Sequence, residues 1–237
     1  MNRILVAVML FACLAAVHAA PAVTEESVGD PDSFGRAQTY LGVTQAGVTL
    51  LADCTGVPPD AAVPCITLNP APASTSVDES DLAMIELPGK ATNSLMCFTF
   101  TPFASWNWSN DTGSQQTAEM FLRPAVRIES EVLDDPGLID PNTGLPFNGV
   151  LFDQTVSTFL QSRTLAVGET DFQFRATTRS CTGGLVNPRT LRDVYGLSDP
   201  LIEEFFKKPI TVSFGVRGRV AMVTDASFSV GVRLYGD

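Results

Sequence analysis

The chain has 237 residues, of which 45% are hydrophobic, so it can bury a sizeable core as one large all-β domain or as two small ones. Its formal net charge is −11 at pH 7, and no cluster of Lys and Arg offsets that charge, which argues against nucleic acid as a partner. The single histidine, His18, lies near the N-terminus.

Residues 1–19 have the anatomy of a secretory signal peptide. Arg3 supplies the basic start, an apolar stretch follows, and small residues around Ala19 suit a cleavage site. A lipobox that ends at Cys13 is the alternative, although the residues after Cys13 are apolar. We expect export to the periplasm, the cell surface or the exterior, with no transmembrane segment in the mature chain.

Cleavage after residue 19 would remove His18 and leave a mature chain without imidazole. Imidazole is the commonest general base and the commonest transition-metal ligand. We therefore expect no catalytic residue, no metal site and no cofactor, which means a protein that is not an enzyme.

The cysteines predict disulfides. Five are present, and Cys13 lies in the leader, which leaves Cys54, Cys65, Cys97 and Cys181. An even number in an exported chain indicates two disulfides, for which three connectivities are open. We favour Cys54–Cys65, which closes a proline-stiffened loop, and Cys97–Cys181, which ties distant strands. Zinc held by all four thiolates is the alternative, but the chain lacks a CxxC pair.

The mature chain begins with residues 20–33, which are rich in Pro, Glu, Asp and Val without periodicity and predict a flexible acidic arm. Residues 40–43 and 48–51 are expected to pair as two strands. Residues 69–80 are polar and of low complexity, and they are the best candidate for an internal linker.

Further strands follow in residues 81–103, where Pro88-Gly89-Lys90 separates two of them. The second has apolar residues on both faces, so we expect it to be central and covered on both sides. Residues 118–132 predict two strands bent at Pro124, and residues 134–149 predict a long turn-rich connector.

Residues 150–180 predict two strands around Val167-Gly168-Glu169. The second strand alternates in polarity, which predicts a buried apolar face and a wet polar face. The apolar set is Thr170, Phe172, Phe174 and Ala176, and the polar set is Asp171, Gln173 and Arg175.

Helix signals lie between Asn187 and Lys208. Asn187-Pro188 fits an N-cap and first turn, and Ser198-Asp199-Pro200 starts a second short helix. Three strands, residues 210–216, 219–223 and 226–235, close the chain. The fold class is therefore all-β: a single antiparallel β-sandwich domain over residues 34–237, with two short helices in one late connection.

Asp111-Thr112-Gly113-Ser114 matches the D-T-G-S signature of pepsin-like and retropepsin-like aspartic proteases. In that chemistry two carboxylates share a proton and no histidine is needed. The resemblance implies a homodimer, because no second D-T-G or D-S-G occurs in the chain. Since Asn107 to Asn110 are turn-like and not an apolar strand, we favour an ordinary turn.

Other carboxylates have ordinary explanations. Glu129 and Glu131 are expected on one solvated strand face, in preference to the facing carboxyl pair of a glycosidase. Asp134, Asp140 and Asn142 suggest a calcium loop, but that loop lacks a third acid and the closing glutamate of an EF-hand. Asx-turns are the favoured interpretation.

Trp106 and Trp108 stand two residues apart, so on a strand both indoles face the same way. Such a pair suits stacking on sugar rings, which makes these two the candidate binding residues. The alternative is that they cap the end of a β core. Asn107 and Asn110 each begin an N-glycosylation sequon, which suits a surface loop.

The last strand, residues 226–235, alternates apolar and polar residues and has Tyr235 at its end. It is similar to the last strand of the donor-accepting subunits of chaperone–usher pili, which also ends near a tyrosine. The resemblance implies an assembly subunit; a plain C-terminal edge strand is the alternative. We therefore expect an exported, non-catalytic structural, assembly or interaction subunit whose partner is a protein or glycan surface. A carbohydrate- or matrix-binding module and a homodimeric aspartic protease are the alternatives.

Overall fold

A computed structural model describes residues 39–58, 61–93, 96–178 and 185–237. The predicted signal peptide, the predicted acidic arm and Cys181 lie outside the described residues. The strands are β1 (Thr39–Leu51), β2 (Cys65–Thr67), β3 (Thr75–Leu87), β4 (Met96–Ser109), β5 (Gln116–Glu129), β6 (Val150–Thr155), β7 (Phe159–Leu165), β8 (Thr170–Ala176), β9 (Ile210–Ala221) and β10 (Val223–Gly236).

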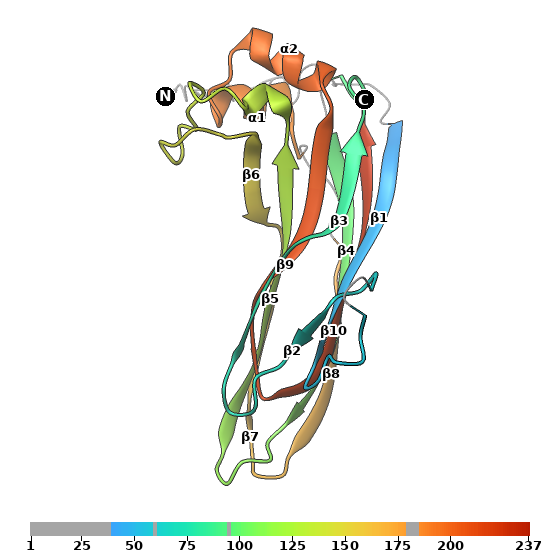
Figure 1. Cartoon of the computed structure of the whole chain (residues 1–237), viewed down its shortest axis with the longest axis vertical. Helices are drawn as coiled ribbons and strands as arrows, with labels where there is room; N and C mark the ends of the chain where they lie inside the picture. The colour runs from blue at the N-terminus through green and yellow to red at the C-terminus, as the bar shows by residue number, and fades with distance from the viewer. Residues whose placement is uncertain (1–38, 59–60, 94–95, 179–184) are drawn as a thin grey trace, which may run out of the picture.

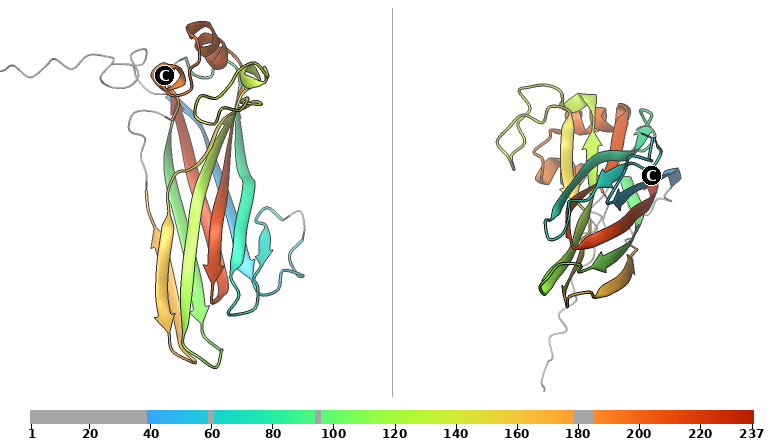
Figure 2. Two further views of the ribbon diagram at one scale, coloured as in Figure 1. Left: turned by 90° about the vertical axis from the view of Figure 1, so that its left-hand side faces the viewer. Right: turned by 60° about the horizontal axis from the view of Figure 1, so that its bottom comes forward.

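Two sheets pack face to face in an elongated sandwich (Figures 1 and 2). Sheet A has the order β2-β1-β10-β4-β8. Sheet B has the order β3-β9-β5-β6, with β7 also paired to β5. Every pairing is antiparallel except that of β1 with β2. The predicted all-β sandwich is confirmed.

The chain crosses between the sheets from β2 to β3, β3 to β4, β4 to β5, β7 to β8, β8 to β9 and β9 to β10. As a result, β1-β10-β4-β8 faces β3-β9-β5-β6/β7, which is the double Greek key order of a jelly roll. Even-numbered residues of β4, β5 and β10 point inward, because successive side chains of a strand alternate between faces. They form one core cluster with β9, which includes Phe100, Met120, Phe214 and Phe228.

Two short helices cover one end of the sandwich (Figure 1). Helix α1 (Pro188–Asp193) begins after Asn187, whose side chain accepts a hydrogen bond from the Thr190 N–H. Helix α2 (Asp199–Lys207) buries Ile202, Phe205 and Phe206. Both helices of the predicted late connection are therefore present. No helix in the described ranges is long and apolar enough to cross a membrane.

The predicted Cys54–Cys65 disulfide is confirmed, with a Cα–Cα distance of 5.8 Å. It closes the loop between β1 and β2, and Cys65 pairs with Thr49 in the parallel bridge. Cys97 is disulfide-bonded as well. Because Cys181 lies outside the described residues, the pairing of Cys97 with Cys181 stays a prediction.

The strand break predicted between residues 43 and 48 is wrong. Residues 39–51 form one strand that pairs along its length with β10. Gly47 lies inside this strand, and glycine suits the position because a Cβ there would come within 3.1 Å of the Phe228 carbonyl oxygen. The proposed linker is also shorter than expected. Asn69 closes a turn through the Ser74 carbonyl, and β3 begins at Thr75.

Pro124 does not separate two strands either. It lies inside β5, between the segment that pairs with β7 and the segment that pairs with β6. Proline lacks an N–H, so it is tolerated where the partner strand changes. Residues 150–176 accordingly form three strands, where two were predicted.

The central strand β4 is covered on one side only, contrary to prediction. Its inner face is buried, whereas Thr101 and Phe103 are exposed on the outer face. The C-terminal strand is not an edge strand, because β10 pairs with β1 on one side and with β4 on the other. The similarity to the terminal strand of a pilus subunit therefore does not extend to a free strand.

Candidate functional site

Trp106 and Trp108 are core residues. Their exposed fractions are 1% and 2%, and the two rings pack edge to face at 5.6 Å between centroids. Both project from the inner face of β4 between the two sheets. No flat indole surface is open to a sugar ring, so the prediction of a sugar platform at these residues is corrected in favour of the core interpretation.

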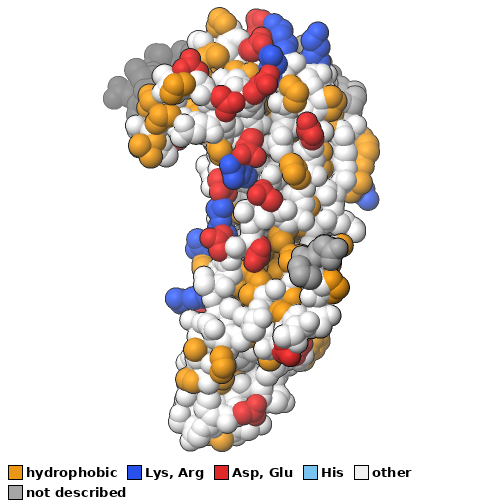
Figure 3. All heavy atoms as spheres, in the orientation of Figure 1, with side chains coloured by type: hydrophobic (Ala, Val, Ile, Leu, Met, Phe, Trp, Pro, Cys, Tyr) orange, Lys and Arg blue, Asp and Glu red, His pale blue; other side chains and the backbone are white. Residues whose placement is uncertain are grey.

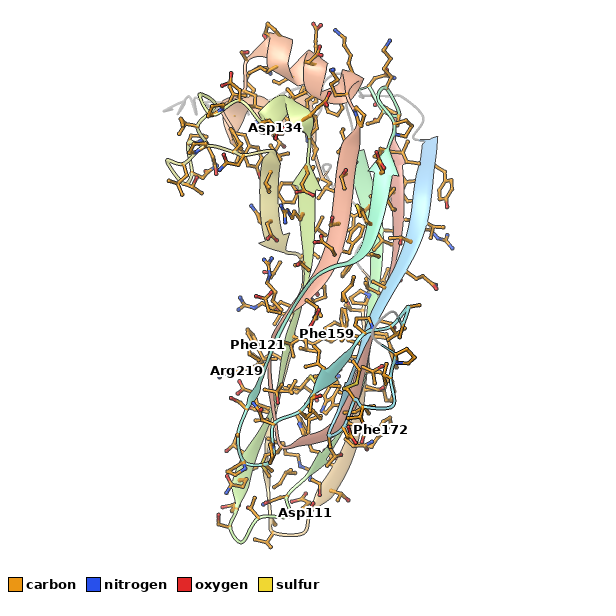
Figure 4. The ribbon with its side chains drawn as sticks, in the orientation of Figure 1. Asp111, Phe121, Asp134, Phe159, Phe172 and Arg219 are labelled. Carbon is orange, nitrogen blue, oxygen red and sulfur yellow. A yellow bond between two sulfur atoms is a disulfide. The ribbon has the colours of Figure 1, made fainter. Side chains whose placement is uncertain are left out.

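Asp111 lies in an exposed turn at the end of β4 (Figure 4). The N–H and hydroxyl of Thr112 both donate to Asn110 Oδ1, at 3.1 and 2.7 Å. This is an Asx-turn whose acceptor is Asn110, and it forms without a role for the Asp111 carboxylate. Residues 107–109 belong to β4, so the expectation that no strand precedes Asp111 is wrong. Asp111 itself is exposed in the turn that follows the strand, which still favours the turn interpretation.

Asn110 is the residue of this turn that sequence analysis undervalued. Its side chain is fully buried, and Nδ2 donates to the carbonyls of Ser114 (2.9 Å) and Leu165 (3.0 Å). It therefore ties the β4–β5 turn to the end of β7. Asn107 is also engaged, because its Nδ2 donates to Asp225 at 2.9 Å. Neither sequon presents the free surface amide that the sequence suggested.

The glutamates predicted to share a strand face each form an ion pair with a basic side chain. Glu129 pairs with Arg127 at 2.6 Å, whereas Glu131 lies beyond the strand in the 3₁₀ helix η3 (Glu131–Leu133) and pairs with Lys208 at 3.0 Å. The predicted shared strand face of the two glutamates is therefore wrong. Lys208 has a raised pKa because its ammonium donates to Glu131.

The connector of residues 134–149 forms the predicted turns. Asp135 Oδ1 accepts from the Gly137 N–H at 2.8 Å, and Asp140 Oδ1 accepts from the Asn142 N–H at 2.9 Å. Across the described ranges, no three His, Cys, Asp or Glu side chains are grouped so that they could hold a metal ion. These carboxylates are used as Asx-turn acceptors, which gives the calcium loop no support.

Arginines on the outer face of sheet B are largely balanced by carboxylates. Arg219 contacts Glu119 at 3.0 Å, and Arg217 contacts Asp153 and Asp78. Hydrogen bonds to Glu119 raise the pKa of Arg219, and those to Asp153 raise the pKa of Arg217. Figure 3 shows charges of both signs interspersed over this face. We therefore do not assign an anion-binding role to Arg217 and Arg219.

Strand β8 departs most from the expected burial. Phe172 and Phe174, predicted to face the core, are 61% and 62% exposed. Asp171 and Gln173, predicted to face water, are half-buried. The alternation of the strand is correct, but its two faces are exchanged. Phe103 of β4, 38% exposed, lies opposite Ala176 on the same outer face.

Polar contacts across the side of the sandwich explain this orientation. Arg163 of β7 donates to Asp171 at 2.7 Å and to Glu169 at 2.5 Å. Gln173 donates to the same Asp171 oxygen at 2.9 Å. Strands β7 and β8 belong to different sheets, so these side chains bridge the open side between them. Inward polar groups with partners leave the phenylalanines on the outside.

The outer face of β8 is also next to a free sheet edge. Within the described residues β8 pairs only with β4 and ends the order of sheet A. A shallow hollow runs along residues 172–176. Figure 4 shows Phe172 in the lower half of the molecule. Exposed aromatic side chains beside an unpaired backbone make this strand the candidate interaction site.

Comparisons with known proteins add little to this picture. No family model matches the chain, and no curated protein matches it. Among solved structures, a chain from the T13 IBDV viral particle is 10% identical and aligns over 78% of this chain with a TM-score of 0.16, which is too low to carry an argument. This chain spans about two fifths of that chain, 39% of its length.

Proposed function

We propose that this chain is an exported, non-catalytic structural or assembly subunit that acts through protein contacts, in the periplasm, at the cell surface or outside the cell. The observation that carries the proposal is the pair Phe172 and Phe174, each more than half exposed on a strand at the edge of a sheet. An edge strand is a template for pairing, and soluble proteins usually protect such strands with charges, bulges or covering segments.

The carbohydrate-binding alternative loses its basis, because it depended on exposed indoles at Trp106 and Trp108. The aspartic protease alternative depended on Asp111, which lies in an exposed turn. We carry neither forward. The predicted signal peptide of residues 1–19 supports the exported location, and the exposed phenylalanines at the sheet edge support a protein as the partner.

Sedimentation velocity of the mature, exported protein tests the proposal. The wild type should associate as its concentration rises to about 100 µM, and Phe172→Ser/Phe174→Ser should shift it to the monomer. Met84→Ser/Leu160→Ser is the matched control, because these apolar side chains are 59% and 62% exposed on sheet B. A wild type that stays monomeric throughout, or a control variant that dissociates equally, would contradict the proposal.

A further inference from the structure

Within the described residues, one side of the β8 backbone has no partner strand. The Thr177 N–H donates to the Pro102 carbonyl at 3.1 Å, and the Glu169 carbonyl accepts from the Asn110 N–H at 3.0 Å. In an antiparallel ladder the residues that bond to one neighbour alternate along the strand. The backbone N–H and C=O groups of the odd-numbered residues of β8 thus point toward β4. Those of Phe172 and Phe174 point toward the opposite, unpaired edge.

The sequence of β8 is complementary to itself about Gln173. One residue away on either side are Phe172 and Phe174, and two residues away are Asp171 and Arg175. If two copies of the strand run antiparallel with Gln173 at the centre, each Phe172 lies opposite a Phe174. Each Asp171 then lies opposite an Arg175. Aromatic pairs and opposite charges are the cross-strand contacts that stabilise antiparallel strands.

The alternating direction of the backbone N–H and C=O groups along β8 permits this register. The groups of Phe172 and Phe174 that point to the free edge would form the hydrogen-bonded pairs. Asp171 and Arg175 would then form the non-hydrogen-bonded pairs, whose side chains are closer together. The registers centred on Phe172 or Phe174 have the same parity, but they separate Asp171 from Arg175 and retain a single phenylalanine pair.

We propose that β8 pairs antiparallel with β8 of a second copy of this chain, in the register centred on Gln173, so that sheet A continues across two molecules. The inference rests on the proposed assembly function and names its partner. A two-fold interface of this kind uses the same patch on both copies. Hydrogen bonds along the edge supply affinity, and the side-chain pairs set the register.

The Asp171 carboxylate can accept hydrogen bonds from a second arginine besides Arg163. Arg163 and Gln173 both donate to its Oδ2, and within the described part of the chain its Oδ1 accepts no hydrogen bond. Its side chain keeps 17% of its surface exposed. Arg175, which is itself exposed and lies beside Gln161 of β7, is the residue that the partner copy would bring to it.

Charge exchange tests the pairing. Asp171→Arg and Arg175→Asp each oppose like charges twice per dimer and should raise the dissociation constant about tenfold or more. The double variant Asp171→Arg/Arg175→Asp should restore association. This rescue separates pairing from folding, because the double variant still places Arg163 against an arginine and would not recover from a purely intramolecular defect. The exchange Glu203→Lys/Lys207→Glu on α2, where the pair is exposed, is the control.

Cross-linking tests the register. Gln173→Cys should form an interchain disulfide under mild oxidation, because its Cα would lie about 4.5 Å from its own copy, within disulfide reach. Phe172→Cys should not, because it would face Phe174. A wild type that associates, with no rescue by the double variant or with cross-linking at residue 172 in place of 173, would overturn this pairing but not the assembly function.

Two further outcomes are informative. If the wild type never associates, both proposals fail. If deletion of residues 20–33 abolishes association while the charge variants leave it unchanged, the strand is occupied by that segment of another copy and the β8–β8 pairing is wrong.

Discussion

Replacement of Asn110 by alanine should destabilise the protein more than any other single change in the β4–β5 turn. The side chain makes four hydrogen bonds: two from Nδ2 to carbonyls and two to Oδ1 from Thr112. Leu165 is fully buried, so its carbonyl would lose its partner in a place that water does not reach. Ser114 is exposed, so its carbonyl would gain water instead.

The magnitude follows from these differences. A buried group left without its partner costs about 1–3 kcal/mol, and an ordinary hydrogen bond contributes about 0.5–1.5 kcal/mol. Asn110→Ala should therefore lower the free energy of unfolding by about 3 kcal/mol. For a domain of this size, that corresponds to a melting temperature lower by about 6–12 °C. Such a loss is a large part of a typical stability of about 5–15 kcal/mol.

The assay is thermal and denaturant unfolding of the mature protein, followed by circular dichroism. Asp111→Ala is the matched control, because it removes the exposed carboxylate next to Asn110 and should change the stability by less than about 0.5 kcal/mol. Asn110→Asp keeps the acceptors for Thr112 but turns a carboxylate toward two carbonyls. It should be at least as destabilising at pH 7 and should recover partly near pH 4, where a carboxyl protonates. Equal melting temperatures for Asn110→Ala and the wild type would refute the reasoning.

Three further outcomes are expected. Cys54→Ser/Cys65→Ser should lower the free energy of unfolding by about 3 kcal/mol in denaturant, because the disulfide closes a short loop, and thiol labelling of the denatured, unreduced wild type should find no free cysteine. Deletion of residues 226–237 should give an aggregated or degraded product, since β10 lies between two partner strands; a soluble fragment that melts normally would show otherwise. Tyr195 should ionise above its ordinary pKa of 10.0, because burial and then Asp140 disfavour the phenolate, so its contribution to stability is present below pH 10.0 and is lost as the pH rises through the folded pKa. The difference in ultraviolet titration between the wild type and Tyr195→Phe measures it, and a midpoint at or below 10.0 would be the contrary result.

The parts of the fold that were predicted correctly depend on interactions between residues close together in the sequence. Asn187-Pro188 begins α1, and Pro200 lies in the first turn of α2, because capping and proline geometry act within a few residues. The Cys54–Cys65 disulfide was favoured for the same reason, as a short loop brings its ends together easily. Gly47 and Pro124 suggest strand ends that the fold does not have, because their neighbours in space, β10 and the ends of β6 and β7, are distant in sequence.

The candidate site was harder to predict, because a period of two residues shows that a strand has two faces and not which of them is buried. In β4 the tryptophans took the inner face, and in β8 the phenylalanines took the outer one. The choice in β8 depends on Arg163, which belongs to another strand and reaches Asp171 across the gap between the sheets. Without the jelly-roll pairing, nothing in the sequence places those two residues together.

The other sheet edges show why β8 is the one suited to a partner. On the opposite side of sheet A, β2 has only three residues, too few to template a long pairing. In sheet B, β3 carries a register shift between Glu79 and Ala83, and the far edge is interrupted where β6 ends at Thr155 and β7 begins at Phe159, although β7 is as long as β8. Very short edge strands such as β2 and bulges such as that of β3 are devices that block edge pairing. Strand β8 has neither an internal register shift nor an outward charge beside its phenylalanines. Among the described strands, β8 is thus an edge that lacks these devices, and a partner strand that covers it would explain their absence.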